Sequence, residues 1–382
     1  MPPLPTLLIR HIHLPSITPF HIVQTLQTHL VSQFLTYKAS LSTSTPSTPP
    51  PPTILTFVPT PVYTTGRREH DSLSSEQIAL LKAPLSPLRK TSHNKYRNPE
   101  WAAVVPTLRG GQTTFHGPGQ LVVYPILDLK PLALPAISSP SAAVGGSGIG
   151  EAENGEKGKG RQSGNVPVYS QWPKGISVRC YVNLLEQSTI NTLAHWTLKG
   201  IRTENPGVWD ESGERKIAAL GVHLRRNITS YGVGLNVNTD LRWFDRIVAC
   251  GLVGKGVVSM RDLGEESGAW EWGRYVEGKT EGIPRAMEDA ILAAEKERGG
   301  EGRRPWLESL QGKNGVQLRA RMKPGIVART WAREFARGLV GEGGEECVVK
   351  VGIEDLDVPE KLLAAYKLET EPWRHDWEDD FW

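Results

Sequence analysis

The stretch KIAALGVHLRRNITSYGVGLNV, residues 216–237, decides the fold. It contains two apolar runs, KIAALGVHL (216–224) and ITSYGVGLNV (228–237), which are separated by the polar residues RRN. A short polar connection between two runs rich in branched and aromatic side chains is typical of a β-hairpin. The segment therefore predicts two antiparallel strands that lie side by side in a sheet.

Segments of alternating type flank this hairpin. Apolar runs predict short strands at LLIRHIHL (7–14), TILTFVP (53–59), AAVVPTL (102–108) and LVVYPILDL (121–129), the second and third of them buried. Helical spacing predicts helices over 18–35, 175–198 and 327–339, with a short helical turn over 240–248. Antiparallel pairs with helices between them place the chain in the α/β class, of the α+β kind, with a mixed β-sheet packed with helices.

Three stretches interrupt this pattern as low-complexity insertions, at about 42–53, 131–171 and 265–316. The first is rich in proline and predicts an extended surface loop. The second replaces nearly all large apolar residues with Gly, Ser and charge, which predicts disorder. The third predicts an exposed, partly helical excursion. We expect residues 1–382 to form a single catalytic domain around these insertions.

Composition excludes several classes of function. The formal net charge is +3 and charged residues make up 22% of the chain, so no concentrated basic surface for nucleic acid is expected. No apolar run approaches the roughly 18 to 20 residues that span a bilayer. The three cysteines, Cys180, Cys250 and Cys347, are widely spaced without a CxxC pair, which argues against a disulfide framework and a zinc site.

The N-terminal region has the composition of an organelle targeting segment, since the first acidic residue is Glu69. The same region contains the predicted strand over 7–14 and a helix with Ile22, Leu26, Leu30 and Phe34 on one face. We therefore expect it to belong to the fold, with any targeting signal short or overlapping it.

The densest chemical signal is the loop RGGQTTFHGPGQ, residues 109–120. Glycine lets the backbone approach a ligand closely, so that consecutive N–H groups converge on an anion or a developing oxyanion. The loop lies between two predicted strands, which favours a binding loop over a structural turn. The loop matches neither GxxxxGK(S/T) nor GxGxxG, the glycine motifs of nucleotide-binding sites, so nucleotide binding is not implied. His116 within it has either a catalytic role as a base or, as we prefer, a structural one that holds the loop.

Cys250 and Lys216 are the candidates for nucleophilic chemistry. A free thiol is only slightly ionised at neutral pH, so a nucleophilic cysteine requires a nearby cation or base. Lys216 opens a predicted strand, from whose end its amine can reach such a thiol and exchange a proton with it. Taken singly, the cysteine is also consistent with a buried apolar residue and the lysine with a solvated charge. We interpret Cys180 and Cys347 as structural.

Several blocks of the chain, in their order and spacing, resemble the lipoyl(octanoyl) transferase family. These are LLIRHIHLPSITPF (7–20), PVYTTGRREH (61–70), RGGQTTFHGPGQ (109–120), NPGVWDESGERKIAALGVHL (205–224), YGVGLNV (231–237) and ACG (249–251). The resemblance covers roughly residues 5–130 and 170–263. Two positions depart from the family pattern, because Tyr231 stands where a histidine is usual and Ala249 where a proline is usual.

The resemblance implies a fold similar to the catalytic domains of biotin and lipoate protein ligases. It implies transfer of an octanoyl group from octanoyl-acyl carrier protein to a lysine of lipoyl domains, including those of 2-oxoacid dehydrogenase complexes and the glycine cleavage H protein. It further implies a mitochondrial matrix location, the longer insertions fitting a fungal relative. No ATP and no metal are expected, because exchange between thioesters is nearly thermoneutral and thioester to amide is downhill.

The resemblance also assigns residues. Cys250 carries the acyl thioester and Lys216 activates it. The acyl pocket would be lined by Arg109, Gly110, Gly111, Gln112, Thr113, Thr114, Phe115, His116, Ala219, Leu220, Gly221, Gly232, Val233 and Gly234. Three rival functions stay open from the residues themselves, namely an ATP-dependent lipoate ligase, a thioesterase and a catalytically silent scaffold that binds partners through its insertions.

Overall fold

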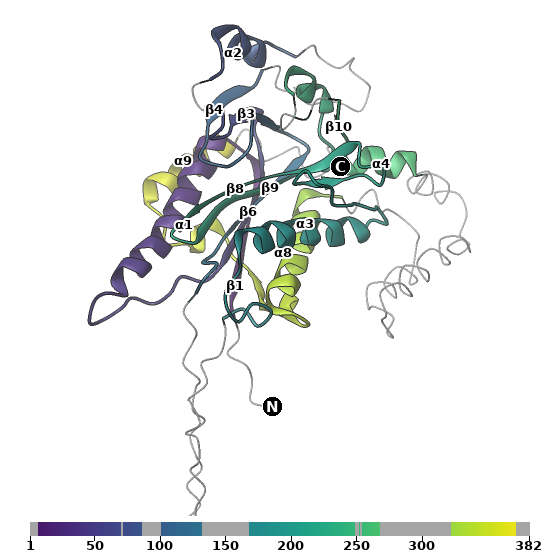
Figure 1. Ribbon diagram of the computed structural model, residues 1–382. Coiled ribbons are helices and arrows are strands. Elements are labelled where there is room, and N and C mark those ends of the chain that lie inside the picture. Colours follow the sequence, from purple (N-terminus) through teal and green to yellow (C-terminus); the bar gives the residue numbers. More distant parts are fainter. Residues whose placement is uncertain are drawn as a thin grey trace, which may run out of the picture.

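The computed structural model describes residues 7–69, 72–85, 101–131, 168–248, 252, 254–267 and 322–371 (Figure 1). Within them, eight strands form one mixed sheet in the order β10-β8-β9-β6-β2-β1-β11, with β7 paired to β8. These strands are β1 (Ile9–Thr18), β2 (Thr53–Pro59), β6 (Gln120–Ile126), β7 (Val208–Trp209), β8 (Arg215–Arg225), β9 (Ile228–Asn236), β10 (Gly256–Val257) and β11 (Val348–Lys350).

The predicted hairpin is confirmed as β8 and β9, which pair from Ala218 with Leu235 to Arg225 with Ile228. The connection is shorter than predicted, because Arg225 still belongs to the strand and only Arg226 and Asn227 turn the chain. Both have positive φ, of 53° and 68°. Two consecutive left-handed residues give a tight turn whose twist matches that of the flanking strands.

Helices cover both faces of the sheet, which confirms the predicted fold class. On one face, α3 (Val178–Ala194) and α8 (Pro324–Val340) bury side chains such as Leu185 and Trp331 in one core cluster. On the other, α1 (Phe20–Ser40) and α9 (Glu360–Thr370) contribute Leu26 and Tyr366 to a second cluster. Figure 1 shows α1 and α9 together on the side of the sheet away from α3 and α8.

The predicted helical faces are confirmed. Ile22, Leu26, Leu30 and Phe34 of α1 are all buried, and so are Val327, Trp331 and Phe335 of α8. The smaller predicted turn is the 3-10 helix η1 (Leu241–Arg246). The other helices are α2 (Ser75–Lys82), α4 (Met260–Glu266), η4 (Gly344–Cys347) and η5 (Ile353–Asp355).

A second sheet of three strands has the order β4-β3-β5, with β3 (Val62–Thr65) between β4 (Ala103–Pro106) and β5 (Thr114–His116). The strand predicted at 102–108 is therefore present as β4, but the expectation that it is buried was wrong. Ala103 and Pro106 are exposed, because β4 pairs with β3 alone and forms the edge of the sheet.

The insertions are described only in part. Residues 42–49 are exposed without regular structure, as the proline content predicts, and the chain enters β2 at Thr53. Most of 131–171 and 265–316, including the stretch for which disorder was expected, lies outside the described residues. Among the described helices, none is long and apolar enough to cross a membrane.

Candidate active site

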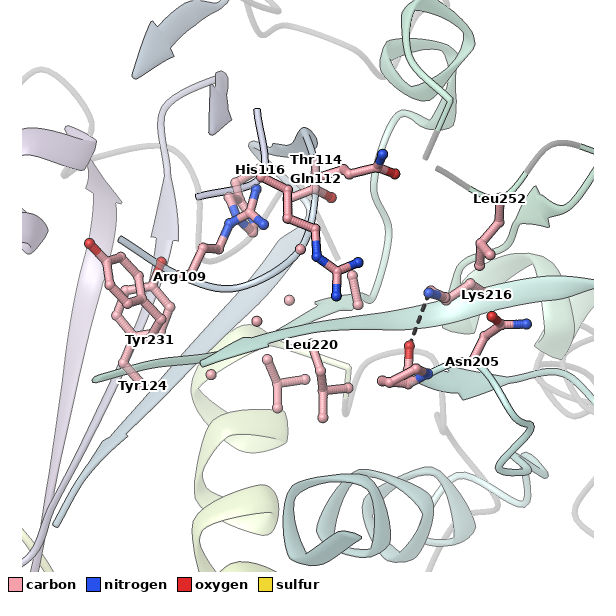
Figure 2. A pocket seen from close by; sticks show the side chains of 18 residues that line it. Arg109, Gln112, Thr114, His116, Tyr124, Asn205, Lys216, Leu220, Tyr231 and Leu252 are labelled. Carbon is pink, nitrogen blue, oxygen red and sulfur yellow. Dashed lines mark hydrogen bonds between the residues drawn. The ribbon is translucent and has the colours of Figure 1, made fainter. Parts of the chain in front are cut away.

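A cavity of about 470 Å³ lies against the β8–β9 hairpin (Figure 2). The glycine-rich loop and the hairpin, predicted separately from the sequence, both line it. Its lining consists of Arg68, Arg109, Gly111, Gln112, Thr114, His116, Tyr124, Asn205, Pro206, Lys216, Ala219, Leu220, Gly221, Tyr231, Gly232, Val233, Gly234 and Leu252.

Small residues on the hairpin leave the space that the loop side chains occupy. Ala219 pairs with Gly234 and Gly221 with Gly232, so these cross-strand pairs place four residues with little or no side chain beside the cavity. A Cβ on Gly221 would lie 2.9 Å from the Cδ of Arg109. Gly221 and Gly234 are thus required by close contact with the loop, and Gly232 by close contact with β6, where a Cβ would lie 2.2 Å from the carbonyl oxygen of Val123.

Arg109 is fixed by its contacts with β3. Its Nη2 donates to the backbone carbonyl of Thr64 at 2.6 Å, and its Nε donates to the Thr64 hydroxyl at 3.2 Å. Only 6% of the residue is exposed. Its aliphatic part covers Gly221, so this arginine joins the small sheet to the hairpin at the cavity.

His116 is held between the loop and the hairpin. Its Nδ1 shares a hydrogen bond of 2.6 Å with the Oε1 of Gln120, and its ring stacks on Phe20 with centroids 6.4 Å apart. A Cβ on Gly234 would lie 3.2 Å from the ring. Burial lowers the pKa of His116 to about 4, which keeps the imidazole uncharged at neutral pH. The preferred structural role agrees with this packing.

Acid is expected to destabilise the protein through this histidine. In the unfolded chain the imidazole takes up a proton near pH 6.5, whereas burial delays protonation in the folded chain to a pKa of about 4. Stability therefore falls as the pH is lowered from about 6.5 towards 4, by an amount on the order of a few kcal/mol. Urea unfolding at stepped pH measures this loss. His116→Asn should lose less over the same interval. The remainder comes chiefly from His11 and His13, whose pKa values burial lowers to about 3 and about 4.

Lys216 lies at the cavity and is 6% exposed. Its Nζ donates to the backbone carbonyl of Pro206 at 3.0 Å and lies 4.6 Å from the centroid of the Trp209 ring. Within the described part of the chain, no carboxylate forms an ion pair with this amine. The amine thus contacts a neutral carbonyl and an aromatic face, which leaves its protons available to reacting groups.

The turn that receives Lys216 is itself anchored. The backbone N–H of Gly207 donates to Glu186 Oε1 at 2.9 Å, and the Trp209 indole N–H donates to the carbonyl of Asn205 at 3.0 Å. Glu186, on α3, is buried and pairs with Arg202 at 3.1 Å. The carbonyl of Pro206 therefore has a fixed position, and Lys216 with it.

Substitution of Gly207 should disturb this arrangement. Gly207 has a φ of +135°, and a Cβ there would lie 2.8 Å from the carbonyl oxygen of Ala218 and 3.0 Å from the Cε of Lys216. Gly207→Ala is expected to cost about 1–3 kcal/mol of stability, since the conformation is strained for any side chain. Displacement of Lys216 should also lower the rate of the acyl transfer that the resemblance implies, which a rate measurement on the folded variant tests. Gly254→Ala is the matched control, with positive φ and open space around it.

Three residues assigned to the pocket by resemblance do not line the cavity. The backbone N–H of Gly110 donates to the carbonyl of Val222, and Thr113 donates to the carboxylate of Glu69. Phe115 packs against Tyr63 and stacks on Trp243 in a separate cluster. Along a strand such as β5, alternate side chains face opposite ways, which explains why Thr114 and His116 line the cavity and Phe115 does not.

Six lining residues were not predicted as site residues, namely Arg68, Tyr124, Asn205, Pro206, Tyr231 and Leu252. Four of them, Arg68, Asn205, Pro206 and Tyr231, belong to sequence blocks that carry the resemblance, so their place in those blocks was an available signal. Tyr124 comes from β6, a strand with no polar motif. Its contribution depends on tertiary packing alone.

Cys250 lies outside the described residues, together with Ala249 and Gly251. Leu252, two positions further along, lines the cavity. The other cysteines are half-buried and do not line it. The helix predicted over 175–198 begins only at Val178, so Cys180 lies in the first turn of α3, and its N–H donates to the capping Ser177 hydroxyl at 3.1 Å. No group of metal-ligating side chains occurs among the described residues.

Comparison with known proteins finds a match over residues 163–273 to the family of lipoyl protein ligase A/B catalytic domains. The "Probable octanoyltransferase" of Schizosaccharomyces pombe is 38% identical over 243 residues, which is 63% of this chain and 80% of the relative. The octanoyl-[acyl-carrier-protein]:protein N-octanoyltransferase LIPT2, mitochondrial, of Danio rerio is 32% identical over 252 residues, 66% of this chain and 81% of the relative. The "Octanoyltransferase, mitochondrial" of Saccharomyces cerevisiae is 34% identical, over 53% of this chain and 50% of the relative.

Two solved structures are also similar. A bi-partite lipoate protein ligase from Thermoplasma acidophilum matches with a TM-score of 0.40 and 10% identity, over 98% of this chain and 95% of that one. Lipoate-protein ligase A bound with ATP matches with a TM-score of 0.35 and 11% identity, over 84% of this chain and 99% of that one.

Proposed function

The chain belongs to the octanoyltransferase family, and from this membership we propose that it transfers an octanoyl group from octanoyl-acyl carrier protein to a specific lysine of lipoyl domains, through a thioester on Cys250. It is an acyltransferase, as the sequence predicted, and its relatives from yeast and fish are mitochondrial octanoyltransferases by name, which agrees with the predicted mitochondrial location. The proposed reaction is the first step of endogenous protein lipoylation.

One observation carries the proposal: the buried Lys216 amine lies at a cavity whose hairpin wall consists of small and apolar residues. Ala219, Leu220 and Val233 present apolar surface beside the glycines. Transfer of a medium-chain acyl group from water to such a surface lowers its free energy. The Lys216 amine, which can exchange a proton with a reacting group, lies at the same cavity. An acyl pocket with a base at its side is what acyl transfer requires.

The first half-reaction loads the enzyme. Lys216 takes the proton of the Cys250 thiol, and the resulting thiolate attacks the thioester carbonyl of the donor. The C–S bond to Cys250 forms, the C–S bond to the carrier breaks, and the carrier leaves as a thiol with the proton that Lys216 returns, so that the amine is neutral again. Lys216 assists by stabilising the thiolate. Backbone N–H groups of the cavity-lining loop residues Gly111 and Gln112 stabilise the oxyanion that develops during attack.

The second half-reaction unloads it. The neutral acceptor lysine of a lipoyl domain attacks the thioester, and an amide bond forms as the C–S bond to Cys250 breaks. Lys216 accepts the proton of the attacking amine and passes it to the Cys250 thiolate, which is released as a thiol. The acceptors in this proposal are the lipoyl domains of 2-oxoacid dehydrogenase complexes and the glycine cleavage H protein. Because the energy of the thioester drives amide formation, neither ATP nor a metal is required. Residues 1–382 serve this chemistry as one catalytic domain.

An acyl-transfer assay separates this function from its rivals. The purified protein is incubated with octanoyl-acyl carrier protein and an apo lipoyl domain, and the acceptor mass is followed without ATP. Octanoylation of the acceptor supports the proposal. Octanoylation only from free octanoate with ATP would identify a ligase, release of octanoate to water a thioesterase, and no reaction in either assay a scaffold.

A further inference from the structure

Two tyrosine rings close the end of the cavity away from Lys216. In Figure 2, Tyr124 and Tyr231 lie at one side of the cavity, Lys216 lies at the other, and Leu220 lies between them. The two rings meet edge to face with centroids 5.5 Å apart. Each tyrosine is at most 5% exposed. The cavity therefore has a reactive end and an aromatic end.

Tyr231 is held in place by three other parts of the molecule. Its backbone N–H donates to the side-chain oxygen of Gln27 on α1 at 2.7 Å. Its hydroxyl accepts from the backbone N–H of Leu108 at 3.3 Å, and its ring packs on Tyr124. Two of these contacts restrain the ring and the third restrains the backbone that carries it, so the ring forms a rigid wall.

The backbone of Tyr231 has an unusual conformation for its position. Its φ is +59°, a left-handed value that most side chains avoid, in the middle of β9. Such a residue breaks the alternation of side chains along the strand, so its ring points to the cavity that Gly232 and Gly234 also line. The fold thus maintains a strained backbone where the ring reaches the cavity.

The register of the hairpin gives the scale of the cavity. Tyr231 pairs with Val222, the sixth residue after Lys216 on β8, so their backbones are roughly 20 Å apart along the strand. The side chains of Lys216 and Tyr231 both extend into this interval. The space left between amine and ring suits an acyl chain of medium length.

We propose that Tyr231 sets the upper limit on the length of the acyl chain that this enzyme accepts. The inference rests on the proposed function and names its specificity-determining residue. A saturated chain whose carbonyl is near Lys216 runs over Ala219 and the hairpin glycines, and its methyl end meets the Tyr231 ring. A longer chain must displace that ring against its contacts with Leu108 and Tyr124.

The decisive variant is Tyr231→Gly, because glycine accepts the left-handed backbone without strain while it removes the whole ring. Binding of free fatty acids from hexanoic to tetradecanoic acid is measured by calorimetry, and acyl-enzyme formation from the matching acyl-carrier proteins by intact mass. For the wild type, affinity should fall steeply beyond the medium-chain acids. For Tyr231→Gly, affinity for dodecanoic acid should rise by about tenfold or more.

Two further variants control for unspecific effects. Tyr231→Phe keeps the ring and its contact with Tyr124 and loses only the hydroxyl, so its limit should move far less than that of Tyr231→Gly. Tyr366→Ala opens the same hydrophobic cluster at a tyrosine of equal exposure that does not line the cavity, and it should leave the limit unchanged. If Tyr231→Gly does not fold, Tyr231→Leu replaces it, with a smaller expected shift in the same direction.

The outcomes separate this inference from the proposed function. An unchanged limit in the folded Tyr231→Gly variant, an equal shift in Tyr366→Ala, or no fatty-acid binding by the wild type overturns the inference. A limit that moves in Tyr231→Gly without any transfer to a lipoyl domain supports the inference and removes the proposed function. Octanoyl transfer to a lipoyl domain, together with an unchanged length limit in Tyr231→Gly, supports the proposed function and overturns the inference.

Discussion

Replacement of Lys216 by methionine is expected to lower octanoyl transfer by about 10²–10⁴-fold, the usual loss when a positioned general acid–base is removed. Methionine fills much of the same volume, so the contact with Trp209 is largely kept while the amine is lost. Single-turnover kinetics should show slowing in both half-reactions, because Lys216 acts in each. Transfer at the wild-type rate would contradict the role assigned to this residue.

Lys255 provides the matched control. Its Nζ lies 6.0 Å from the centroid of the same Trp209 ring, but it donates to Glu214 at 2.8 Å and does not line the cavity. Lys255→Met therefore removes one positive charge from the same neighbourhood without removing the proposed base. Its transfer rate should stay close to that of the wild type, which separates proton transfer from general electrostatic effects.

Replacement of Cys250 by alanine is expected to abolish the acyl-enzyme. After incubation with octanoyl-acyl carrier protein, the wild-type protein should gain about 126 Da, the octanoyl group less the displaced hydrogen, and a lipoyl domain should then remove it. Intact mass spectrometry followed by peptide mapping measures both steps. An adduct on the alanine variant, or transfer that survives the substitution, would remove Cys250 as the nucleophile.

The two described cysteines control for unspecific acylation. Cys180→Ala and Cys347→Ala each remove a half-buried thiol that does not line the cavity. Burial raises the pKa of Cys347, which disfavours its reactive thiolate. Both variants should form the adduct and transfer it as the wild type does.

The elements that depend on local pattern were predictable from the sequence. The hairpin followed from two apolar runs around a polar connection, and α1 and α8 followed from apolar residues at helical spacing. The loop at 109–120 was singled out because its glycine content excludes regular structure. Residues of this loop contact Gly221 of β8 and Gly234 of β9, which explains why each strand of the hairpin has a glycine at that position.

Features that depend on distant residues were not predictable. The burial of β4 was predicted wrongly because an apolar run does not reveal whether a strand has one neighbour or two. The Pro206 carbonyl is anchored because the N–H of Gly207 donates to Glu186 on α3, and no local sequence pattern predicts this contact between a helix and a turn. For the same reason the aromatic end of the cavity became visible only when β6 and β9 were placed side by side.

The pairing of β1 with β11 has a consequence for how the molecule is made. Ile9 lies opposite Val348, so this part of the sheet joins segments separated by most of the chain. Contacts between such distant segments form late, because the entropy of closing the intervening loop must be overcome first. During synthesis, β1 stays without this neighbour until nearly all of the chain has emerged. Completion of the sheet is thereby delayed, which favours translocation of an unfolded chain. Until then, the unpaired edge of β1 exposes the nascent protein to aggregation.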